Sequence, residues 1–137
     1  MQITNEIRFK HFEGSESITV VLRQPTSEEV SRFLKARFPS VRNKTINQRA
    51  EAQIAFIDRI LTGVDGLTVA NAAGEQIPVG PGMALTEADT AAWQQRFGWK
   101  VATWKDLIPS YWKTSWALRF EENAAPALED DAGPDPL

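Results

Sequence analysis

The stretch from residue 45 to residue 63 constrains the fold more than any other part of this chain. Its apolar residues recur at steps of three and four, the spacing that lines one face of an α-helix: Ile46, Ala50, Ile54, Ile57 and Leu61. Phe56 and Ile60 widen this stripe until most of the last two turns are apolar. A helix with so much apolar surface needs neighbours on two sides, so we expect the rest of the chain to pack around it.

Both ends of this helix carry capping signals. Thr45 and Gln48 have the spacing of a capping box, in which each side chain bonds the backbone N–H of the other residue. Gly63 stands where a left-handed residue ends a helix. Within the helix, Asp58 is either part of a polar face or a buried carboxylate, and the sequence leaves both interpretations open.

Two pairs of short alternating segments predict two β-hairpins. Residues 2–12 and 17–23 alternate apolar and polar side chains, and the polar residues 13–16 between them favour a turn. Residues 67–70 and 76–79 have a similar strand-like composition on either side of an Asn-Ala-Ala-Gly turn. The sequence therefore predicts an N-terminal hairpin and a second short β pair.

Three further helices and one single turn complete the predicted elements. Apolar periodicity and stop signals place helices over 26–38, 86–98 and 109–122, and a single turn over 103–107. Three of these segments begin with a residue that favours the N-cap position: Thr26, Thr86 and Thr103. We expect an α+β fold in which the N-terminal hairpin and the second short β pair pack against four or five α-helices.

Length and charge distribution indicate one domain followed by a short tail. A chain of 137 residues, 42% of them hydrophobic, suits one core, which we place over residues 1–122 as a single globular α+β domain. The last 17 residues hold six of the 18 acidic residues and no lysine or arginine, so residues 1–120 carry 12 acids against 15 bases. Residues 123–137 are acidic and rich in proline and alanine, and we predict that they are disordered because they bury too little apolar surface.

Composition and motifs argue against an enzyme. The chain has no cysteine and a single histidine, His11, so one copy cannot build a zinc site of the usual His/Cys kind. We find no phosphate-binding loop and no Gly-x-Ser-x-Gly nucleophile motif. We therefore expect no catalytic residue, no cofactor and no metal.

Charge and hydropathy also restrict partners and location. No apolar run approaches 18 residues and the N-terminal ten residues carry charges, so we expect neither membrane association nor a signal peptide, and we expect a cytoplasmic protein. The weak positive charge of residues 1–120 argues against a nucleic-acid partner. A local basic cluster is either a solvated helix end or a binding site, for which the acidic tail would compete: Lys35, Arg37, Arg42 and Lys44.

The tryptophans are concentrated in one part of the chain. All five fall within 24 residues: Trp93, Trp99, Trp104, Trp112 and Trp116. A small domain cannot easily enclose five indoles, so we expect about three inside and one or two at a contact surface. The candidate protein-binding residues are the last four of these tryptophans and two phenylalanines: Trp99, Trp104, Trp112, Trp116, Phe33 and Phe38.

Several segments together resemble the small tail assembly chaperones of long-tailed bacteriophages and prophages. They are the hairpin, the helix start L-R-Q-P-T-S-E-E-V, the stretch A-F-I-D-R-I-L-T-G-V-D-G-L and W-K-D-L-I-P at 104–109, and the resemblance covers roughly residues 18–120. It implies a non-enzymatic role in the cytoplasm of a bacterial host. Such chaperones coat the apolar, helical tape measure protein and help recruit tail tube protein. The exposed aromatic residues would supply the contact surface.

Other functions stay open beside this one. The chain could be a structural neck or tail-completion protein, or a small prophage-encoded binding domain of unknown ligand. An enzyme or small-molecule-binding domain would need a polar pocket with converging titratable groups, and a transcriptional regulator would need a basic recognition helix. Whether the chain forms a homo-oligomer is also open.

Overall fold

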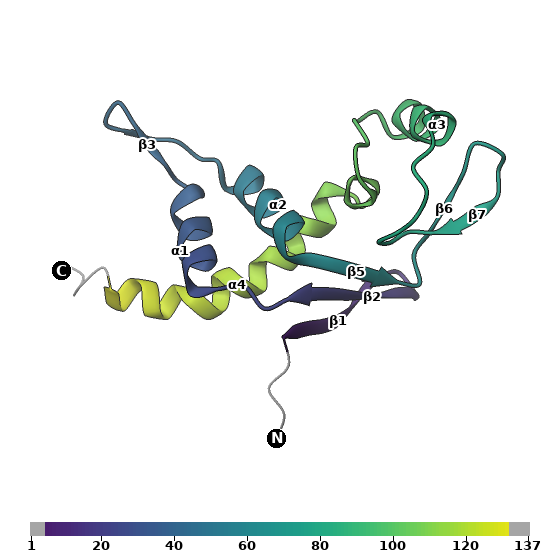
Figure 1. Cartoon of the computed structure of the whole chain (residues 1–137). Helices are drawn as coiled ribbons and strands as arrows, with labels where there is room; N and C mark the ends of the chain where they lie inside the picture. The colour runs from purple at the N-terminus through teal and green to yellow at the C-terminus, as the bar shows by residue number, and fades with distance from the viewer. Residues whose placement is uncertain (1–4, 132–137) are drawn as a thin grey trace, which may run out of the picture. The chain divides into compact units, whose positions relative to one another are not determined.

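Helices and antiparallel strands alternate along the chain, so the fold class is α+β, as the sequence predicts (Figure 1). The structure is a computed structural model that describes the backbone of residues 5–131 and the side chains of residues 5–122. The elements in chain order are β1 (Glu6–Glu13), β2 (Glu16–Arg23), α1 (Ser27–Ala36), β3 (Ser40–Val41), β4 (Lys44–Thr45), α2 (Arg49–Ile60), β5 (Leu61–Asp65), β6 (Thr68–Ala70), β7 (Gln76–Pro78), α3 (Glu87–Phe97), the 3₁₀ turn η1 (Trp104–Leu107) and α4 (Ser110–Asp131).

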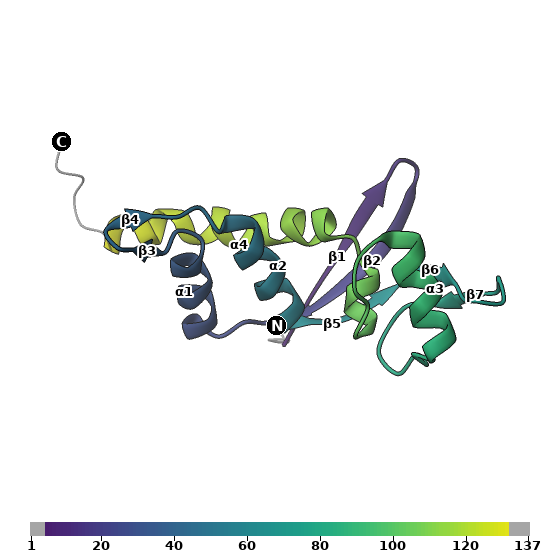
Figure 2. The ribbon, with the colours of Figure 1, turned by 90° about the horizontal axis from the view of Figure 1, so that it is seen from above.

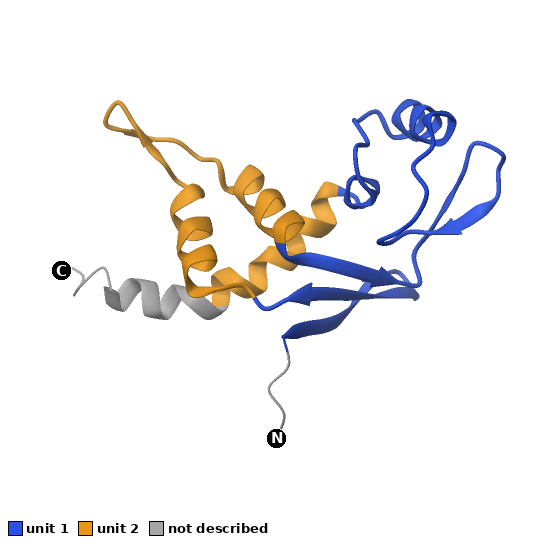
Figure 3. Cartoon of the chain, viewed as in Figure 1, with its two compact units in different colours: residues 1–24, 60–109 blue, residues 25–59, 110–137 orange. Residues whose placement is uncertain are grey.

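The chain divides into two compact units, coloured separately in Figure 3. Unit 1 comprises residues 1–24 and 60–109, and unit 2 comprises residues 25–59 and 110–137. Unit 1 therefore holds all strands except the β3–β4 pair, together with α3 and η1. Unit 2 holds α1, the β3–β4 pair, nearly all of α2, and α4.

The first sheet of unit 1 is antiparallel, with the strand order β1-β2-β5. The predicted N-terminal hairpin is present, and its strands pair from Glu6 opposite Arg23 to Glu13 opposite Glu16. Gly14 in its two-residue turn has a φ of 63°, a conformation that glycine adopts at little cost. In β2 the alternation of apolar residues places every second side chain inward, so the most deeply buried ones are Val20 and Leu22.

A second apolar cluster of unit 1 forms around Trp93 on α3. The indole is fully buried and its Nε1 donates a hydrogen bond of 2.8 Å to the carbonyl oxygen of Ala70. The other buried members of the cluster are Val69, Val79, Val101 and Leu107. The predicted second β pair, β6–β7, contributes to this cluster and forms a two-stranded sheet of its own.

Unit 2 contains the helices α1, α2 and α4, which Figure 2 shows from above. The ring of Phe33 on α1 stacks on that of Phe56 on α2 with a centroid distance of 4.4 Å. Phe120 on α4 meets the same Phe56 ring edge-on at 5.0 Å. Phe56 therefore links all three helices of the unit.

The predicted ends of the central helix are wrong. Thr45 does not cap α2 but lies in β4, paired with Ser40, and Asn47 Oδ1 instead accepts a hydrogen bond of 3.1 Å from the N–H of Arg49. Gly63 does not end the helix either, because it lies in β5 opposite Val21. The chain passes directly from α2 into β5, where β2 supplies the backbone partners that a helix cap would otherwise provide.

The predicted apolar stripe is also displaced at its beginning. Ile46 and Ala50 are exposed, since the first precedes α2 and the second lies in its first turn. The buried residues of α2 are Ala52, Gln53, Phe56, Ile57 and Ile60. Which residues of α2 are buried therefore depends on the segments that pack against this helix in the fold.

Helix α4 begins close to the predicted residue and ends later than the predicted end at 122. Its backbone stays helical to Asp131, and the part beyond Glu122 includes Pro126, which has no N–H to donate to the helix. Residues 132–137 of the predicted disordered tail lie outside the described residues. Disorder of the tail stays a prediction.

Candidate functional site

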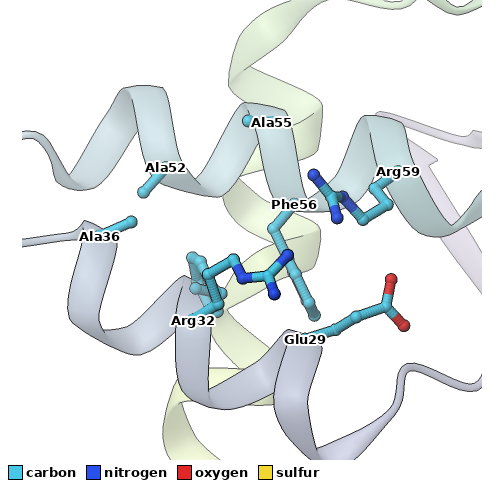
Figure 4. A pocket seen from close by; sticks show the side chains of 8 residues that line it. Glu29, Arg32, Ala36, Ala52, Ala55, Phe56 and Arg59 are labelled. Atoms are coloured by element: carbon cyan, nitrogen blue, oxygen red, sulfur yellow. The ribbon is translucent and has the colours of Figure 1, made fainter.

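A groove lies between α1 and α2 in unit 2 (Figure 4). Each helix contributes four of its lining residues: Glu29, Arg32, Phe33 and Ala36 from α1, and Ala52, Ala55, Phe56 and Arg59 from α2. The groove exists because three of these positions are alanine, which leaves space between the helices, while the stacked rings of Phe33 and Phe56 form an apolar floor. Figure 4 shows Ala36 opposite Ala52, with Phe56 between the two helices.

The volume of the groove is about 130 Å³. Cavities on the order of 150 Å³ hold a benzene ring, so this groove has room for one large apolar side chain. Its rim is charged, and two of the rim groups have partners on α1 or at its N-cap. Arg32 Nη2 lies 2.7 Å from Glu28 Oε1, and the Glu29 carboxylate accepts a hydrogen bond of 2.9 Å from the N–H of Thr26. The groove therefore combines an apolar floor with a rim of three charged side chains, Glu29, Arg32 and Arg59 (Figure 4).

Two of the predicted binding residues lie on and just after α1. Phe33 is only 4% exposed and forms part of the groove floor. Phe38 is 46% exposed, and the guanidinium carbon of Arg37 lies 5.5 Å from its ring centroid. Phe38 is therefore open to a partner, whereas Phe33 is reached only through the groove.

Two more of the predicted residues belong to unit 1. Trp99 is 41% exposed, stacks on Phe97 with a centroid distance of 5.2 Å, and donates from Nε1 to the Asp106 carbonyl oxygen at 2.6 Å. These contacts hold one indole face rigid while the rest of the ring stays accessible. Trp104 is half-buried and packs against the cluster around Trp93.

The last two predicted residues lie on α4 in unit 2. Trp116 is buried and Trp112 is half-buried, with their ring centroids 6.4 Å apart. Tyr111 beside them is 64% exposed. The six predicted residues are thus divided between the units, four in unit 2 and two in unit 1.

Sequence reasoning missed the alanines that open the groove. Ala36, Ala52 and Ala55 were not singled out because an alanine in a helix has no signal of its own; it marks a groove only when a second helix lies opposite. The one available hint was the aromatic residue near each alanine, Phe33 before Ala36 and Phe56 after Ala55.

Sequence reasoning also missed a buried carboxylate that holds unit 2 together. Glu121 on α4 is 6% exposed, and its Oε2 accepts from Arg37 at 2.6 Å and from Arg49 at 3.0 Å. Gln53 Nε2 donates to the other oxygen. Burial by itself would raise the pKa of Glu121, but the hydrogen bonds from Gln53, Arg37 and Arg49, with the charge of Arg49, outweigh it and hold the pKa below its usual value.

A second buried ion pair resolves the two interpretations of Asp58. Its Oδ1 lies 2.8 Å from Nζ of Lys113, a lysine whose side chain is only 3% exposed, while the Asp58 side chain is 34% exposed. Asp58 is therefore a partly exposed carboxylate that neutralises a buried ammonium. Both this pair and the Glu121 cluster join elements of the fold, which is a structural role.

No match to a known protein came from comparison with family models, with curated proteins or with solved structures. Within the side chains that the structure describes, no three histidine, cysteine or acidic residues gather as a metal ion would require. Among the described helices, none has the length and apolar character needed to cross a membrane.

Proposed function

We propose that this protein is a non-enzymatic tail assembly chaperone of a long-tailed bacteriophage or prophage. In this proposal it binds apolar helical segments of the tape measure protein in the host cytoplasm and aids assembly of the tail tube protein around them. The sequence resemblance over residues 18–120 motivates the choice of family. The groove between α1 and α2 is the observation that supports a binding role most directly.

The physical argument starts from what a tape measure helix needs. A long apolar helix aggregates in water unless its side chains are covered, and a groove with an aromatic floor can accept one such side chain reversibly. The groove over Phe33 and Phe56 has that floor, and its small volume limits it to one side chain at a time. Weak, repeated binding of this kind suits a chaperone that the assembling tube must displace.

Exposed aromatic residues offer a separate contact in each unit. Phe38 follows α1, and Trp99 offers a rigidly held indole in unit 1. Rigid aromatic side chains lose little conformational entropy on binding, which is why they are frequent at interface hot spots. Trp116 is buried, so in this proposal it supports α4 and does not touch the partner.

The experiment that tests this proposal fills the groove with a larger side chain. Ala55 is exposed on α2, so Ala55→Leu should be tolerated by the fold while its side chain occupies the space above Phe56. Co-expressed with the tape measure protein of the same genome, wild type should keep that protein soluble, and Ala55→Leu should lower its soluble yield by about fivefold or more, equivalent to about 1 kcal/mol of contact. Ala91→Leu, the same change at an exposed position of α3, is the matched control and should behave as wild type.

Two results would count against the proposal. One is a tape measure protein that is equally soluble with wild type, with Ala55→Leu and without either. The other is recovery of this protein as a stoichiometric part of purified virions, which would identify a structural neck or tail-completion component instead. Circular dichroism of both leucine variants checks that a loss of binding is not a loss of folding.

A further inference from the structure

The rim of the groove between α1 and α2 carries a charge that an apolar binding site does not need. Its two arginines come from different helices, Arg32 from α1 and Arg59 from α2, and Figure 4 shows their guanidinium groups pointing toward one another near Phe56. Two cations that face each other repel, and an anion placed between them removes that repulsion. The mouth of the groove therefore favours an anionic group.

Both arginines can bind such a group. Arg59 is exposed and has no ion-pair partner among the side chains of residues 5–122. Arg32 bonds Glu28 through Nη2, but these two side chains are 60% and 79% exposed, and exposed ion pairs contribute little to stability. A guanidinium group has five N–H donors, so Arg32 can bond a second carboxylate beside that of Glu28.

The one carboxylate among the lining residues of the groove, that of Glu29, already has a partner. Its Oε1 accepts a hydrogen bond of 2.9 Å from the N–H of Thr26, while the Thr26 hydroxyl accepts one of 3.1 Å from the N–H of Glu29. This capping box holds the carboxylate at the N-terminal end of α1, where the helix dipole favours a negative charge. Two guanidinium groups against one carboxylate leave the rim with a net positive charge.

The floor of the groove restricts what can accompany the anion. It consists of the stacked rings of Phe33 and Phe56, under a volume of about 130 Å³. An inorganic anion gains nothing from an apolar floor, and an uncharged apolar side chain leaves the two guanidinium groups facing each other. The complementary ligand therefore has one large apolar group with a carboxylate close to it.

A helix presents these two groups at a suitable separation. Residues three or four positions apart lie on one face of a helix, with about 5–6 Å between their Cβ atoms. We propose that the groove binds a partner helix through a leucine, methionine or phenylalanine that enters it and a glutamate or aspartate one turn away that bonds Arg32 and Arg59. This inference rests on the proposed function, and it defines which segments of an apolar partner helix the groove selects.

A contact of this size should be weak and sensitive to salt. One apolar side chain and one carboxylate bury little area, so we expect a dissociation constant on the order of millimolar for a single site. A long partner that repeats the pair along its length would bind more tightly, because its sites act together. Affinity should fall as salt rises, since exposed ion pairs are screened.

The test titrates the ¹⁵N-labelled full chain with four alanine-rich helical peptides, followed by NMR. The first peptide has a leucine and, four residues later, a glutamate; the second and third replace the glutamate by glutamine and by lysine, and the fourth replaces the leucine by alanine. The amide signals of Ala36, Ala55 and Phe56 should shift most with the leucine–glutamate peptide. That peptide should bind about fivefold or more tightly than the leucine–glutamine peptide, and the other two should give no saturable shift.

Variants of the rim separate charge selection from apolar contact. Arg59→Gln should reduce the affinity for the leucine–glutamate peptide to that for the leucine–glutamine peptide, and Arg59→Glu should make the leucine–lysine peptide the tighter ligand. Arg42→Glu, in the exposed turn between β3 and β4, makes the same change in net charge in the same unit and should bind as wild type does. Ala55→Leu should abolish binding of every peptide because it fills the groove.

Three outcomes overturn the inference. They are equal affinity for the glutamate and glutamine peptides, no saturable shift with any peptide, and shifts by inorganic phosphate as strong as those by the leucine–glutamate peptide. The first outcome still leaves an apolar groove, so the proposed function would survive it. Conversely, a groove that selects the leucine–glutamate peptide while the tape measure protein gains no solubility would reject the proposed function and keep this inference.

Discussion

Replacement of Glu121 tests the central claim about unit 2, that one buried carboxylate joins three helical segments. Glu121→Ala removes both oxygens and leaves Arg37, Arg49 and Gln53 facing an apolar gap. Removing one partner of a buried ion pair costs about 3–5 kcal/mol, because the other charge stays buried and uncompensated. The cost here should be at the lower end, since the Arg49 side chain is 44% exposed and can regain water.

The three groups that donate to Glu121 differ in how well water can replace the lost carboxylate. The Arg37 side chain is 16% exposed and Gln53 is 5% exposed, so neither can be fully rehydrated. We therefore expect Glu121→Ala to lower the free energy of unfolding by about 3 kcal/mol. Glu121→Gln should lower it by about 1–2 kcal/mol, because an amide oxygen can still accept from one arginine and the Gln53 amide can turn to accept from the new NH₂ group.

Urea unfolding followed by far-UV circular dichroism measures both losses. The matched control is Glu122→Ala, one residue further along α4 at an exposed position, which should change the free energy of unfolding by less than about 0.5 kcal/mol. The reasoning is refuted if Glu121→Ala and Glu122→Ala cost the same, or if Glu121→Ala costs less than about 1 kcal/mol. Either result would mean that apolar contacts hold unit 2 together and that the Glu121 cluster contributes little to its stability.

Four further predictions follow from described contacts. The pKa of Glu121 is lower in the folded protein than its usual 4.5. The carboxylate therefore stabilises the fold fully above about pH 4.5, and this contribution is lost as pH falls through the folded pKa. The difference in the free energy of unfolding between wild type and Glu121→Gln should shrink in acid. Asp58→Ala should cost about 2–4 kcal/mol in urea because it leaves the buried ammonium of Lys113 uncompensated, whereas Lys113→Met should stay within about 1 kcal/mol of wild type. Trp93→Phe removes a buried hydrogen bond and part of an indole, so unit 1 should lose about 2 kcal/mol, and a loss below about 0.5 kcal/mol would contradict its placement. Gly98→Ala should cost about 1 kcal/mol in thermal unfolding, since Gly98 ends α3 with a φ of 83°.

Local hydrogen bonding explains which element boundaries could be predicted. Thr26 and Glu29 form the predicted capping box, with the hydroxyl accepting at 3.1 Å and the carboxylate at 2.9 Å. Thr86 caps α3 as predicted, and Gly98 ends it in the left-handed conformation. In each case both partners lie within four residues of one another, so the bond depends on the local sequence alone.

Prediction from the local sequence was wrong where a segment distant in sequence supplied the hydrogen-bond partner. Thr45 and Gly63 have the right identity and spacing for helix ends, yet one pairs with Ser40 and the other with Val21. Val21 lies about forty residues before Gly63, so no window of sequence around the helix contains the competing interaction. Backbone groups bond to whichever partner the fold provides, and here β2 provided it.

The candidate site also has some features that the sequence reveals and others that only the structure reveals. The excess of tryptophan was evident from composition, but exposure separates Trp99, which is accessible, from Trp116, which is buried. The alanines of the groove became recognisable only when Ala36 and Ala52 were found on facing helices. Whether a side chain is available to a partner depends on what covers it, and covering residues are distant in sequence.

The sequence by itself determined the α+β class, the two hairpins, the capped starts of α1 and α3 and the segregation of acidic from basic residues along the chain. These features depend on side-chain alternation, on short-range hydrogen bonds and on composition. Only the tertiary structure decided the direct passage from α2 into β5, the groove over Phe33 and Phe56, and the convergence of Arg37, Arg49 and Gln53 on Glu121. The physical reason is separation along the chain: Arg37 and Glu121 are 84 residues apart, and their charges attract strongly only after folding has brought them together and excluded most of the water around them.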